Sequence, residues 1–468
     1  MSKFQKDLTQ GNVAKHLILF ALPLMASNFL QALYNMSDMF FVGRFVGAVG
    51  ATAVGVGGQV TFLVLNLISG LAVGGTVLIA QYIGANRQED VKRTISTIFT
   101  LYGAAGVALT FVMLVADRYI LNLLISDPLA YPETLKYTNI CMSGLVFIFG
   151  YNAVSAVLRG MGDSRHPLMF VAVAALLNIG LDALFCGPFG WGAAGAAWAT
   201  VISQGVSFLL SVWFLRRQKF LFDFHPKSFR IDRDIVKQLL RIGLPSSVGG
   251  TTVSFSFIAL TGVANSIAGI VGTTALSITS KVNSVAILPG FAMQAAVSSM
   301  AGQNLGAQKH DRAFKTCLTA IGITLCVTLP VMLMVRAFAV PITRFFLGTD
   351  GGLDPAVAAA CVEQAALYIR SVSWDYILVA WTFNIIGLAL AAGHTKFTLT
   401  TSVISSILAR VPAAWLLGRT LAMGLAGMGL AVPITSALVL AIDIVYLASG
   451  RWKKSKVMVG PLEMAMEF

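Results

Sequence analysis

The sequence predicts an all-α integral membrane protein of twelve transmembrane helices, arranged as two six-helix bundles that repeat one another. Three observations carry this prediction. The 468 residues are 57% hydrophobic and 11% charged, whereas a soluble domain carries about 25% charged residues. Apolar stretches long enough to cross a bilayer follow one another along the whole chain. The second half of the chain also repeats the first at a nearly fixed spacing.

The apolar stretches define the spans. A helix needs about 20 apolar residues to cross the hydrocarbon core of a bilayer. The predicted spans are residues 17–42, 53–83, 94–116, 136–158, 167–187, 190–215, 241–264, 272–304, 315–338, 365–391, 398–418 and 425–449. Several exceed the minimum length, so we expect tilted or kinked helices.

The internal repeat is visible by direct counting. One constant offset places Pro23 on Pro245 and continues without a gap as far as Thr94 on Thr316. Toward the end of each half the offset is slightly larger and places Gly192 on Gly424. Because six spans per repeat is an even number, both repeats enter the membrane from the same side. Repeats of this kind are typical of transporters, which bind their substrate within or between the halves.

The distribution of charge predicts the orientation. The formal net charge is +13, which in a soluble protein would suggest nucleic acid as a partner. Here the basic residues gather in short loops and in the segment 216–240, so we expect no nucleic acid. The opposite loops are acidic or nearly uncharged, for example at Asp127 and Asp350. The positive-inside rule then places both termini in the cytoplasm of a multi-pass cell-membrane protein.

The same pattern divides the chain into four parts. Segment 216–240 is rich in Phe and in charge, and it separates the two predicted bundles. The predicted parts are an N-terminal lobe (1–215), a cytoplasmic inter-lobe loop (216–240), a C-terminal lobe (241–450) and a cytoplasmic tail (451–468).

Polar residues inside the first six spans predict a cation site. Asp38 and Asp182 both lie late in spans that run outward, Asn178 precedes Asp182 by one helical turn, and Thr200 lies near the middle of span 6. Ionisable residues within a membrane are costly and usually functional. Carboxylate, amide and hydroxyl oxygens bind hard cations such as Na⁺, and two neighbouring carboxyl groups can share a proton. The alternative is that Asn178 and Thr200 only hold helices together.

The second half differs at these positions. The repeat places Leu260, Arg410 and Ala414 where the first half has Asp38, Asn178 and Asp182. We expect its buried charges to be Lys281, Asp375 and Arg410, with Asp375 paired to Lys281 or to Arg410. A structural ion pair is the favoured interpretation, and a role in substrate binding or coupling is the alternative. Asp443 lies near the inner end of the last span and is expected at the membrane interface.

Other side chains near the first acid suggest a substrate pocket and a hinge. Gln31, Tyr34 and Met36 lie in the outer half of span 1, and Asn152 lies in span 4. Methionine and aromatic side chains adapt to varied apolar ligands, and aromatic faces attract organic cations. Such residues are also common in cores and on lipid-facing surfaces. Pro23 removes a backbone hydrogen bond and predicts a kink in span 1, although prolines in membrane helices need not move.

These residues together resemble the multidrug and toxic compound extrusion (MATE) family, most closely its DinF-like prokaryotic branch. The resemblance rests on Pro23 followed by Asp38, the pair Asn178 and Asp182, Thr200, and the Gln-x-x-Gly-Ala segments after spans 2 and 8. It covers the whole chain and implies a V-shaped pair of bundles around a central cavity. It also implies a cation site at the four polar residues named above, with Gln31, Tyr34 and Asn152 lining the adjacent pocket. In the other branch of the family, a cation site in the second half includes an acid in span 7. The second half of this chain has no acid in span 7, which argues against such a second site.

The predicted function is therefore secondary transport. We expect an antiporter, not an enzyme, that exports cationic or amphipathic organic compounds in exchange for H⁺ or Na⁺, with Asp38 and Asp182 as the coupling acids. No cofactor is expected, and no phosphate-binding loop follows a strand. The expected partners are small organic molecules and membrane lipids, and the chain is expected to be a monomer. One alternative is a flippase for lipid-linked envelope precursors, which would need a basic cavity; another is a non-transporting scaffold.

Overall fold

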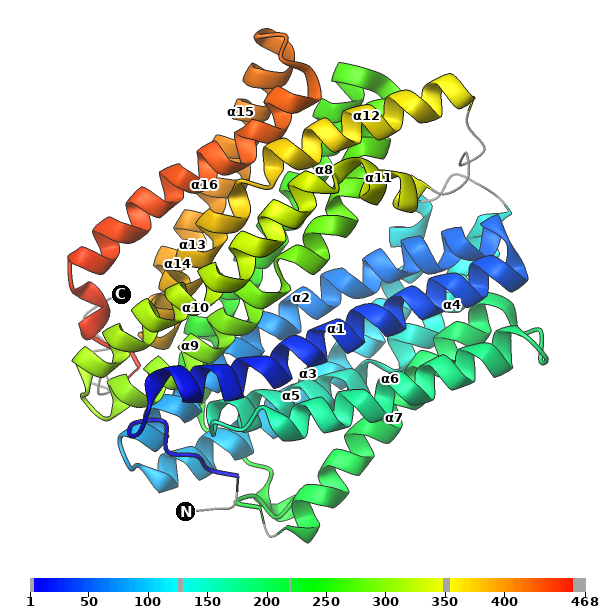
Figure 1. The fold of residues 1–468 in the computed structure, drawn as a ribbon. Coiled ribbons are helices and arrows are strands. Elements are labelled where there is room, and N and C mark those ends of the chain that lie inside the picture. The colour runs from blue at the N-terminus through cyan, green and yellow to red at the C-terminus, as the bar shows by residue number, and fades with distance from the viewer. Residues whose placement is uncertain (1–3, 125–128, 219, 348–353, 458–468) are drawn as a thin grey trace. The chain divides into compact units, whose positions relative to one another are not determined.

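The computed structural model describes residues 4–124, 129–218, 220–347 and 354–457, and these residues form helices joined by short loops (Figure 1). Because the apolar stretches must satisfy every backbone N–H and C=O within the segment, helices are the expected element. The helices of the first repeat are α1 (Val13–Val46), α2 (Ala48–Gly84), α3 (Gln88–Leu124), α4 (Ala130–Ser143), α5 (Leu145–Gly160), α6 (Arg165–Cys186) and α7 (Gly192–Arg217).

The second repeat has longer and more interrupted helices. Its α-helices are α8 (Arg233–Ala286), α9 (Leu288–Gly306), α10 (His310–Ala337), α11 (Ala339–Leu347), α12 (Pro355–Val372), α13 (Asp375–Ala391), α14 (Thr395–Val403), α15 (Arg410–Trp415) and α16 (Gly424–Ala448). Two π-helical segments, η2 (Ile404–Ala409) and η3 (Leu416–Thr420), flank α15, and two short 3₁₀ turns are η1 (Pro226–Ser228) and η4 (Arg451–Lys453).

The number of spans agrees with the prediction. Within the described ranges, nine helices can cross a membrane by length and composition, and up to eleven spans result if the bent pairs α4–α5 and α12–α13 each count as one. α8 has 54 residues, about 80 Å of helix, which is far longer than a bilayer is thick. It is two helices joined at Ala268 and Gly269, whose backbone angles are not helical. Counting α8 as two gives the twelve predicted spans.

The bent pairs explain why two predicted spans began too late. Span 4 was predicted to begin at residue 136 and span 10 at residue 365, whereas α4 begins at Ala130 and α12 at Pro355. The two pairs bend by 46° and 43°. The first part of each pair carries polar residues, such as Glu133 in α4 and Glu363 in α12, that lowered the hydropathy where these spans begin. The predicted outer-loop acids Asp127 and Asp350 lie outside the described residues.

The chain forms two compact units. The first unit comprises residues 1–9 and 22–247, and the second comprises 10–21 and 248–468. The predicted four-part division stays a prediction, and the division between the compact units falls after Ser247, a few residues beyond segment 216–240. Helix α8 begins within that segment, and its first turns pack with the first unit. In both repeats the division falls close to the helical proline, Pro23 in α1 and Pro245 in α8.

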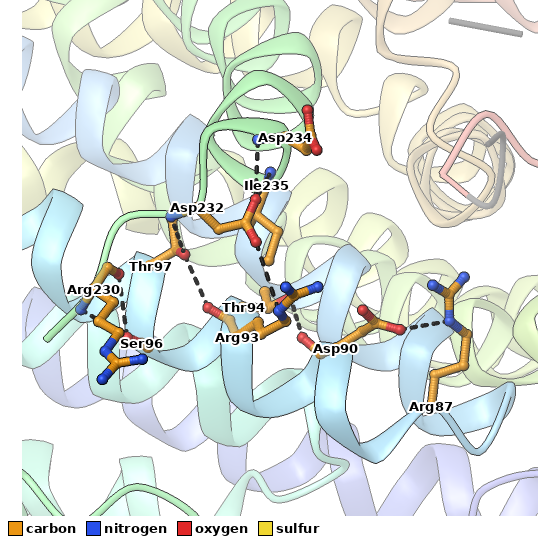
Figure 2. A network of polar contacts seen from close by, with 10 residues as sticks. All are labelled: Arg87, Asp90, Arg93, Thr94, Ser96, Thr97, Arg230, Asp232, Asp234 and Ile235. Atoms are coloured by element: carbon orange, nitrogen blue, oxygen red, sulfur yellow. Dashed lines mark hydrogen bonds and ion pairs between the residues drawn. The ribbon is translucent and has the colours of Figure 1, made fainter. Parts of the chain in front are cut away.

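Segment 220–232 is held on α3 by aromatic and polar contacts. The ring of Phe99 on α3 lies 5.2 Å from that of Phe222 and 5.1 Å from that of Phe224. Figure 2 shows part of the polar contacts, in which the backbone N–H of Arg230 donates to the hydroxyl of Ser96 at 2.9 Å. The same hydroxyl donates to the carbonyl of Ser228 at 2.6 Å. Burial of these aromatic rings is the physical reason that the predicted loop joins the first unit.

Asp232 both caps helix α8 and links it to α3. Its Oδ1 accepts the backbone N–H groups of Asp234 and Ile235 at 3.0 and 3.3 Å, which is the role of an N-cap carboxylate (Figure 2). Its own backbone N–H donates to the hydroxyl of Thr97 at 3.2 Å, and its Oδ2 lies 3.7 Å from Nε of Arg93. Both interactions with α3 fix the residue that starts the first helix of the second repeat.

Farther along α8, close packing replaces hydrogen bonds. A Cβ atom on Gly70 of α2 would lie 2.4 Å from the backbone nitrogen of Ser247, and one on Gly243 would lie 2.9 Å from the Cα of Leu71. The hydroxyl of Tyr82, farther along α2, donates to Oε1 of Gln238 at 2.9 Å. Glycine lets two helix backbones approach this closely, so the first turns of α8 are tightly fixed to α2.

The N-terminal segment also packs on the first unit. Phe4 is buried against the rings of Phe220 and His166, at 5.5 and 5.1 Å. The backbone N–H of Lys6 donates to the carbonyl of Met161, and the carboxylate of Asp163 contacts both the His166 ring and the Lys6 ammonium. Burial raises the pKa of Asp163, but the hydrogen bond and charge of His166 and the charge of Lys6 outweigh it, so the pKa lies below its usual value.

The predicted tail is partly packed. Trp452 is buried and stacks on Phe314 of α10 with ring centroids 5.8 Å apart, and the backbone N–H of Lys456 donates to the carbonyl of Ala392. Residues 458–468 lie outside the described residues.

Candidate cation site in the first unit

Three helices of the first unit bring Asp38, Asn178 and Thr200 into contact. The side-chain N–H of Asn178 on α6 donates to Oδ1 of Asp38 on α1 at 3.0 Å and to the Thr200 hydroxyl on α7 at 3.3 Å. The Thr200 hydroxyl in turn donates to Oδ2 of Asp38 at 3.1 Å. Each oxygen of Asp38 thus accepts one hydrogen bond, and the residue is 4% exposed. These bonds favour the charged form of the Asp38 carboxyl group.

Asp182 lies at the same site but has a different environment. It follows Asn178 by one turn of α6 and is 0% exposed. Its carboxyl group faces the side chains of Asp38 and Ser37, yet neither of its oxygens accepts a hydrogen bond of normal geometry. A carboxylate without donors in a water-free place is strongly disfavoured. The two neighbouring acids therefore differ in how well each can hold a negative charge.

Three oxygen atoms at this site have no hydrogen-bond partner. They are the two carboxyl oxygens of Asp182 and the amide oxygen of Asn178, whose side chain is 1% exposed. Buried polar atoms in a folded protein nearly always have a partner, so three acceptors without one are unusual at a single place. The chemistry of these oxygens fits a proton or a small hard cation.

Local sequence explains how the acids reach one another. The spacing of four residues between Asn178 and Asp182 places both side chains on one face of α6, and α6 lies against α7 along its length (Figure 1). α1 is one continuous helix in which Pro23 is accommodated, and the Ser27 hydroxyl donates to the Pro23 carbonyl at 2.9 Å. The predicted kink at Pro23 is thus not a break of α1 in this structure.

The predicted substrate residues are only partly gathered around the site. Tyr34 lies beside Gln204 of α7 and within electrostatic reach of Asp38. Met36 is 62% exposed, so its side chain points away from the bundle. The Asn152 amide donates to the carbonyl of Ile148, one turn earlier in the same helix, at 2.8 Å. Gln31 is half-buried on α1.

The predicted ion pair of the second unit is not formed. Lys281 is exposed at an open cavity of about 370 Å³ lined by Thr273, Thr274, Ser277, Ile278, Phe346 and Leu347. Among the described residues, Asp375 makes no ion pair with Lys281 or Arg410, although Arg410 acts on it electrostatically. Arg410 donates to the Ser405 hydroxyl at 3.3 Å. The expected buried pair was wrong because the bend between α12 and α13 puts Asp375 at the start of a helix and not within one.

Two residues of the site were missed by sequence reasoning. Ser37 contacts Asp182, and Gln204 contacts Tyr34. Both had a signal in the sequence, because Ser37 is adjacent to Asp38 and Gln204 follows Thr200 by one helical turn. A search for polar neighbours at i±1 and i+4 of each buried acid or hydroxyl would have found them.

The fold defines a polytopic membrane protein with two repeated six-span units, and the first unit holds a buried acid pair. Comparison with known families makes the assignment specific. The chain belongs to the MatE family, whose model matches it twice, over residues 23–184 and 245–416. The starts of the two matches differ by the offset that places Pro23 on Pro245, and their ends differ by the offset that places Gly192 on Gly424. The internal repeat is therefore confirmed with both of its offsets. The predicted MATE resemblance is also confirmed, and the DinF-like branch stays a prediction.

Curated relatives extend over nearly the whole chain. The probable multidrug resistance protein YpnP of Bacillus subtilis is 29% identical, with 96% of this chain and 98% of the relative covered. The probable multidrug resistance protein NorM of Thermotoga maritima is 25% identical, with 95% and 94% covered.

Solved structures of transporters share the fold. A MOP superfamily transporter from Pyrococcus furiosus superposes with a TM-score of 0.89 at 24% identity, covering 97% of this chain and 98% of its own. A MATE structure in a bent conformation gives a TM-score of 0.87 and one in a straight conformation gives 0.86, each at 24% identity and 96% coverage of this chain. At this level of identity the likeness shows the twelve-helix, two-bundle fold alone.

Proposed function

We propose that this protein is a secondary antiporter that exports cationic or amphipathic organic compounds, driven by cation entry at Asp38 and Asp182. The observation that carries the proposal is the buried acid pair with three unused oxygen acceptors. The names of the curated relatives, which describe probable multidrug resistance proteins, support export of organic compounds. Transport, and not catalysis, is the proposed activity.

A proton is the proposed coupling ion. Asp38 accepts two hydrogen bonds from Asn178 and Thr200, whereas Asp182 accepts none of normal geometry. Two carboxyl groups in direct contact repel one another unless one holds a proton. We therefore place the proton on Asp182, where its O–H can donate to the carboxylate of Asp38. Na⁺ at the same oxygens is the alternative, and Asn178 would supply a further ligand through its free Oδ1.

Export is coupled to proton entry because the proton and the organic cation compete for the negative charge of the acid pair. When Asp182 releases its proton, the site gains a second negative charge in a place that excludes water. An organic cation near Tyr34 then binds more tightly, because aromatic and carboxylate groups both attract it. Reprotonation removes that attraction and favours release. A ligand shifts a conformational equilibrium only through different affinities for the two states, and protonation of the acid pair supplies such a difference.

The movement that accompanies coupling is proposed to involve α1. Pro23 leaves the helix without one backbone hydrogen bond, and the boundary between the two compact units passes just before it. The part of α1 beyond Pro23 carries Asp38. A change of charge at Asp38 can therefore act on the segment that joins the units. The V shape and central cavity implied by the family resemblance belong to this proposal.

Orientation and surroundings are part of the same proposal. The basic residues of the loops and of the segment 216–240 favour a cytoplasmic location for that side of the protein, with both termini inside a cell membrane. We propose that the monomer is the functional unit, with lipids around it and no nucleic acid partner.

The experiment is dye efflux from proteoliposomes under an imposed pH gradient or an imposed Na⁺ gradient, one at a time. Wild-type protein should export an ethidium-like cation when the pH gradient alone is imposed. Asp38→Asn and Asp182→Asn should lose this transport. Asp117→Asn is the matched control, since Asp117 is also buried but lies at the far end of α3, outside the site, and it should retain wild-type rates.

Three outcomes contradict the proposal in different ways. Wild-type efflux rates in both site variants would remove the acid pair from the mechanism. Efflux driven by the Na⁺ gradient alone would replace the proton with Na⁺. Dye efflux near zero in the wild-type protein, together with loss of envelope-precursor export when the gene is deleted, would favour a flippase for lipid-linked precursors.

A further inference from the structure

The second unit contains a buried carboxyl group that the proposed transport cycle does not use. Asp443 lies on α16 and is 0% exposed. Neither of its oxygens has a hydrogen-bond partner, and it forms no ion pair with any residue that the structure describes. The expectation that Asp443 lies near the membrane interface concerns its depth and stays a prediction. The helix turns this side chain into the bundle instead of toward its surface.

The surroundings of Asp443 are polar but carry no positive charge among the described residues. The Cys317 thiol on α10 is within electrostatic reach of Asp443 and lies 3.5 Å from the backbone carbonyl of Asn384 on α13. The Asn384 side chain is 0% exposed and donates to the Thr324 hydroxyl at 3.0 Å, while its own amide oxygen has no partner. In the described part of the chain, the Asp443 carboxyl group has a thiol nearby and no group that would neutralise a negative charge.

The internal repeat argues that packing does not require an acid here. The offset that places Gly192 on Gly424 also places Ser211 of α7 on Asp443. Ser211 is equally buried, and its hydroxyl donates to the carbonyl of Phe208 at 2.7 Å. The first unit thus fills this position with a small, fully satisfied side chain. Of these two equivalent positions, only the one in the second unit carries a carboxyl group.

A charged Asp443 would be unstable at this place. Burying an ionised carboxylate without a partner costs many kcal/mol, and such a group instead takes up a proton or binds a cation. A hard metal cation needs several oxygen ligands, whereas the titratable neighbours of Asp443 are the thiol of Cys317 and the phenol of Tyr446. A proton needs only one carboxyl oxygen. We propose that Asp443 is a second proton-binding residue, in the second unit, separate from the Asp38–Asp182 pair.

A hydrogen-bonded pair connects this acid to the end of the unit. Tyr446 follows Asp443 by three residues on α16, so both lie on the same face, and its hydroxyl bonds to Nδ1 of His394 at 2.8 Å. The other ring nitrogen of His394 contacts the carbonyl of Lys454 at 3.0 Å, and the ring is partly exposed. Tyr446 and His394 form the route by which the Asp443 proton exchanges with water.

The titratable groups that face Asp443 are few. In the described part of the chain they are the Cys317 thiol on α10 and the Tyr446 hydroxyl on α16 itself. α12, α13 and α15, which also pack against α16, place no charged group against the carboxyl. Among these groups, the carboxyl group of Asp443 is therefore the one to which the proposal assigns the proton.

The test is infrared spectroscopy of the full-length protein in lipid at neutral pH. The difference spectrum between wild type and Asp443→Asn should contain the carbonyl band of a protonated carboxyl group, which the variant has lost. Asp163→Asn is the matched control, because Asp163 is equally buried but contacts His166 and Lys6. Its difference spectrum should show the bands of an ionised carboxylate instead. Asp443→Glu should keep the protonated band at a shifted position, which covers the case that Asp443→Asn does not fold.

Exchange with solvent is tested by transfer to D₂O. The Asp443 band should shift in wild type, and the shift should be slower in Tyr446→Phe. Carboxylate bands from Asp443 at neutral pH, or replacement of the protonated band when NaCl is added, would overturn the proposal. A protonated band that never shifts in D₂O would show an inert structural acid and overturn the exchange route. Because these readouts do not involve dye transport, their failure is distinguishable from failure of the proposed antiport.

Discussion

Gly70 on α2 offers a test of how tightly α8 is fixed to the first unit. A Cβ atom at this position would lie 2.1 Å from the Ser247 hydroxyl oxygen, 2.4 Å from the Ser247 backbone nitrogen and 2.5 Å from the Gly243 carbonyl oxygen. The hydroxyl can rotate away, but the two backbone atoms cannot. Ordinary contact begins at 3.4 Å, so Gly70→Ala requires the two helices to separate by roughly 1 Å at their crossing.

The magnitude follows from two opposing effects. Alanine favours a helix over glycine by up to about 1 kcal/mol. Overpacking of a tight contact costs typically about 1–3 kcal/mol, and separation of α2 from α8 also weakens the neighbouring contact between Gly243 and Leu71. We expect Gly70→Ala to lower the free energy of unfolding by about 1–2 kcal/mol net. The assay is chemical unfolding of the detergent-solubilised protein, followed by the circular dichroism of its helices.

A control on the same helix separates packing from helix propensity. Gly58 also lies in α2, but a Cβ atom there would meet nothing within 4 Å. Gly58→Ala should therefore be neutral or slightly stabilising. Ser247→Gly added to Gly70→Ala should not restore stability, because the clashing nitrogen and the Gly243 carbonyl remain. Equal stability of Gly70→Ala and Gly58→Ala would refute the argument that this crossing is closely packed.

Two further predictions concern polar contacts of the first unit. Asp232→Ala should lower the free energy of unfolding by about 1 kcal/mol, because the helix cap is lost. Asp232→Asn should keep the cap, and Arg93→Ala, which removes only the ion pair, should cost less. Equal losses in all three variants, measured by urea unfolding, would instead make the ion pair the main interaction. Asp163→Asn should loosen the N-terminal segment, measured by proteolysis at Lys6. The folded-state pKa of Asp163 is lowered, so the stability that Asp163 contributes is fully present above its unfolded-state pKa of about 4. That stability is lost as the pH falls through the folded-state pKa. Wild type and variant should therefore become equally susceptible to proteolysis only in acid.

The sequence predicted the number of spans and the repeat because both depend on patterns that extend over many residues. Hydropathy over about 20 residues is insensitive to a few local exceptions. The boundaries inside the chain were harder. Segment 216–240 has the composition of a connecting loop, but Phe222 and Phe224 bury their rings against Phe99 of α3. That contact joins residues far apart along the chain, and no local pattern contains it.

Part of the candidate site could likewise be predicted from the sequence, and part of it could not. Asp38, Asn178, Asp182 and Thr200 could be predicted together because an acid inside an apolar helix is rare and its depth can be counted from the helix end. The unequal environments of Asp38 and Asp182 could not be predicted, since they depend on which carboxyl oxygen each donor reaches. Pairing of Asp375 was predicted wrongly for a similar reason. Counting treated span 10 as one straight helix, whereas the chain bends by 43° between α12 and α13 and Asp375 is the first residue after the bend.

The two repeats carry buried acids at positions that do not correspond. In the first unit the two acids of the candidate site are on α1 and α6, and the equivalent positions of the second unit hold Leu260 and Ala414. In the second unit the buried acid is Asp443 on the last helix, and the equivalent position of the first unit holds Ser211. A duplicated backbone therefore explains the shape of each unit but not its chemistry. If each unit holds its own proton, neutralising one acid site leaves the other able to titrate. The double variant Asp182→Asn with Asp443→Asn should then lose two protonated carboxyl bands where each single variant loses one.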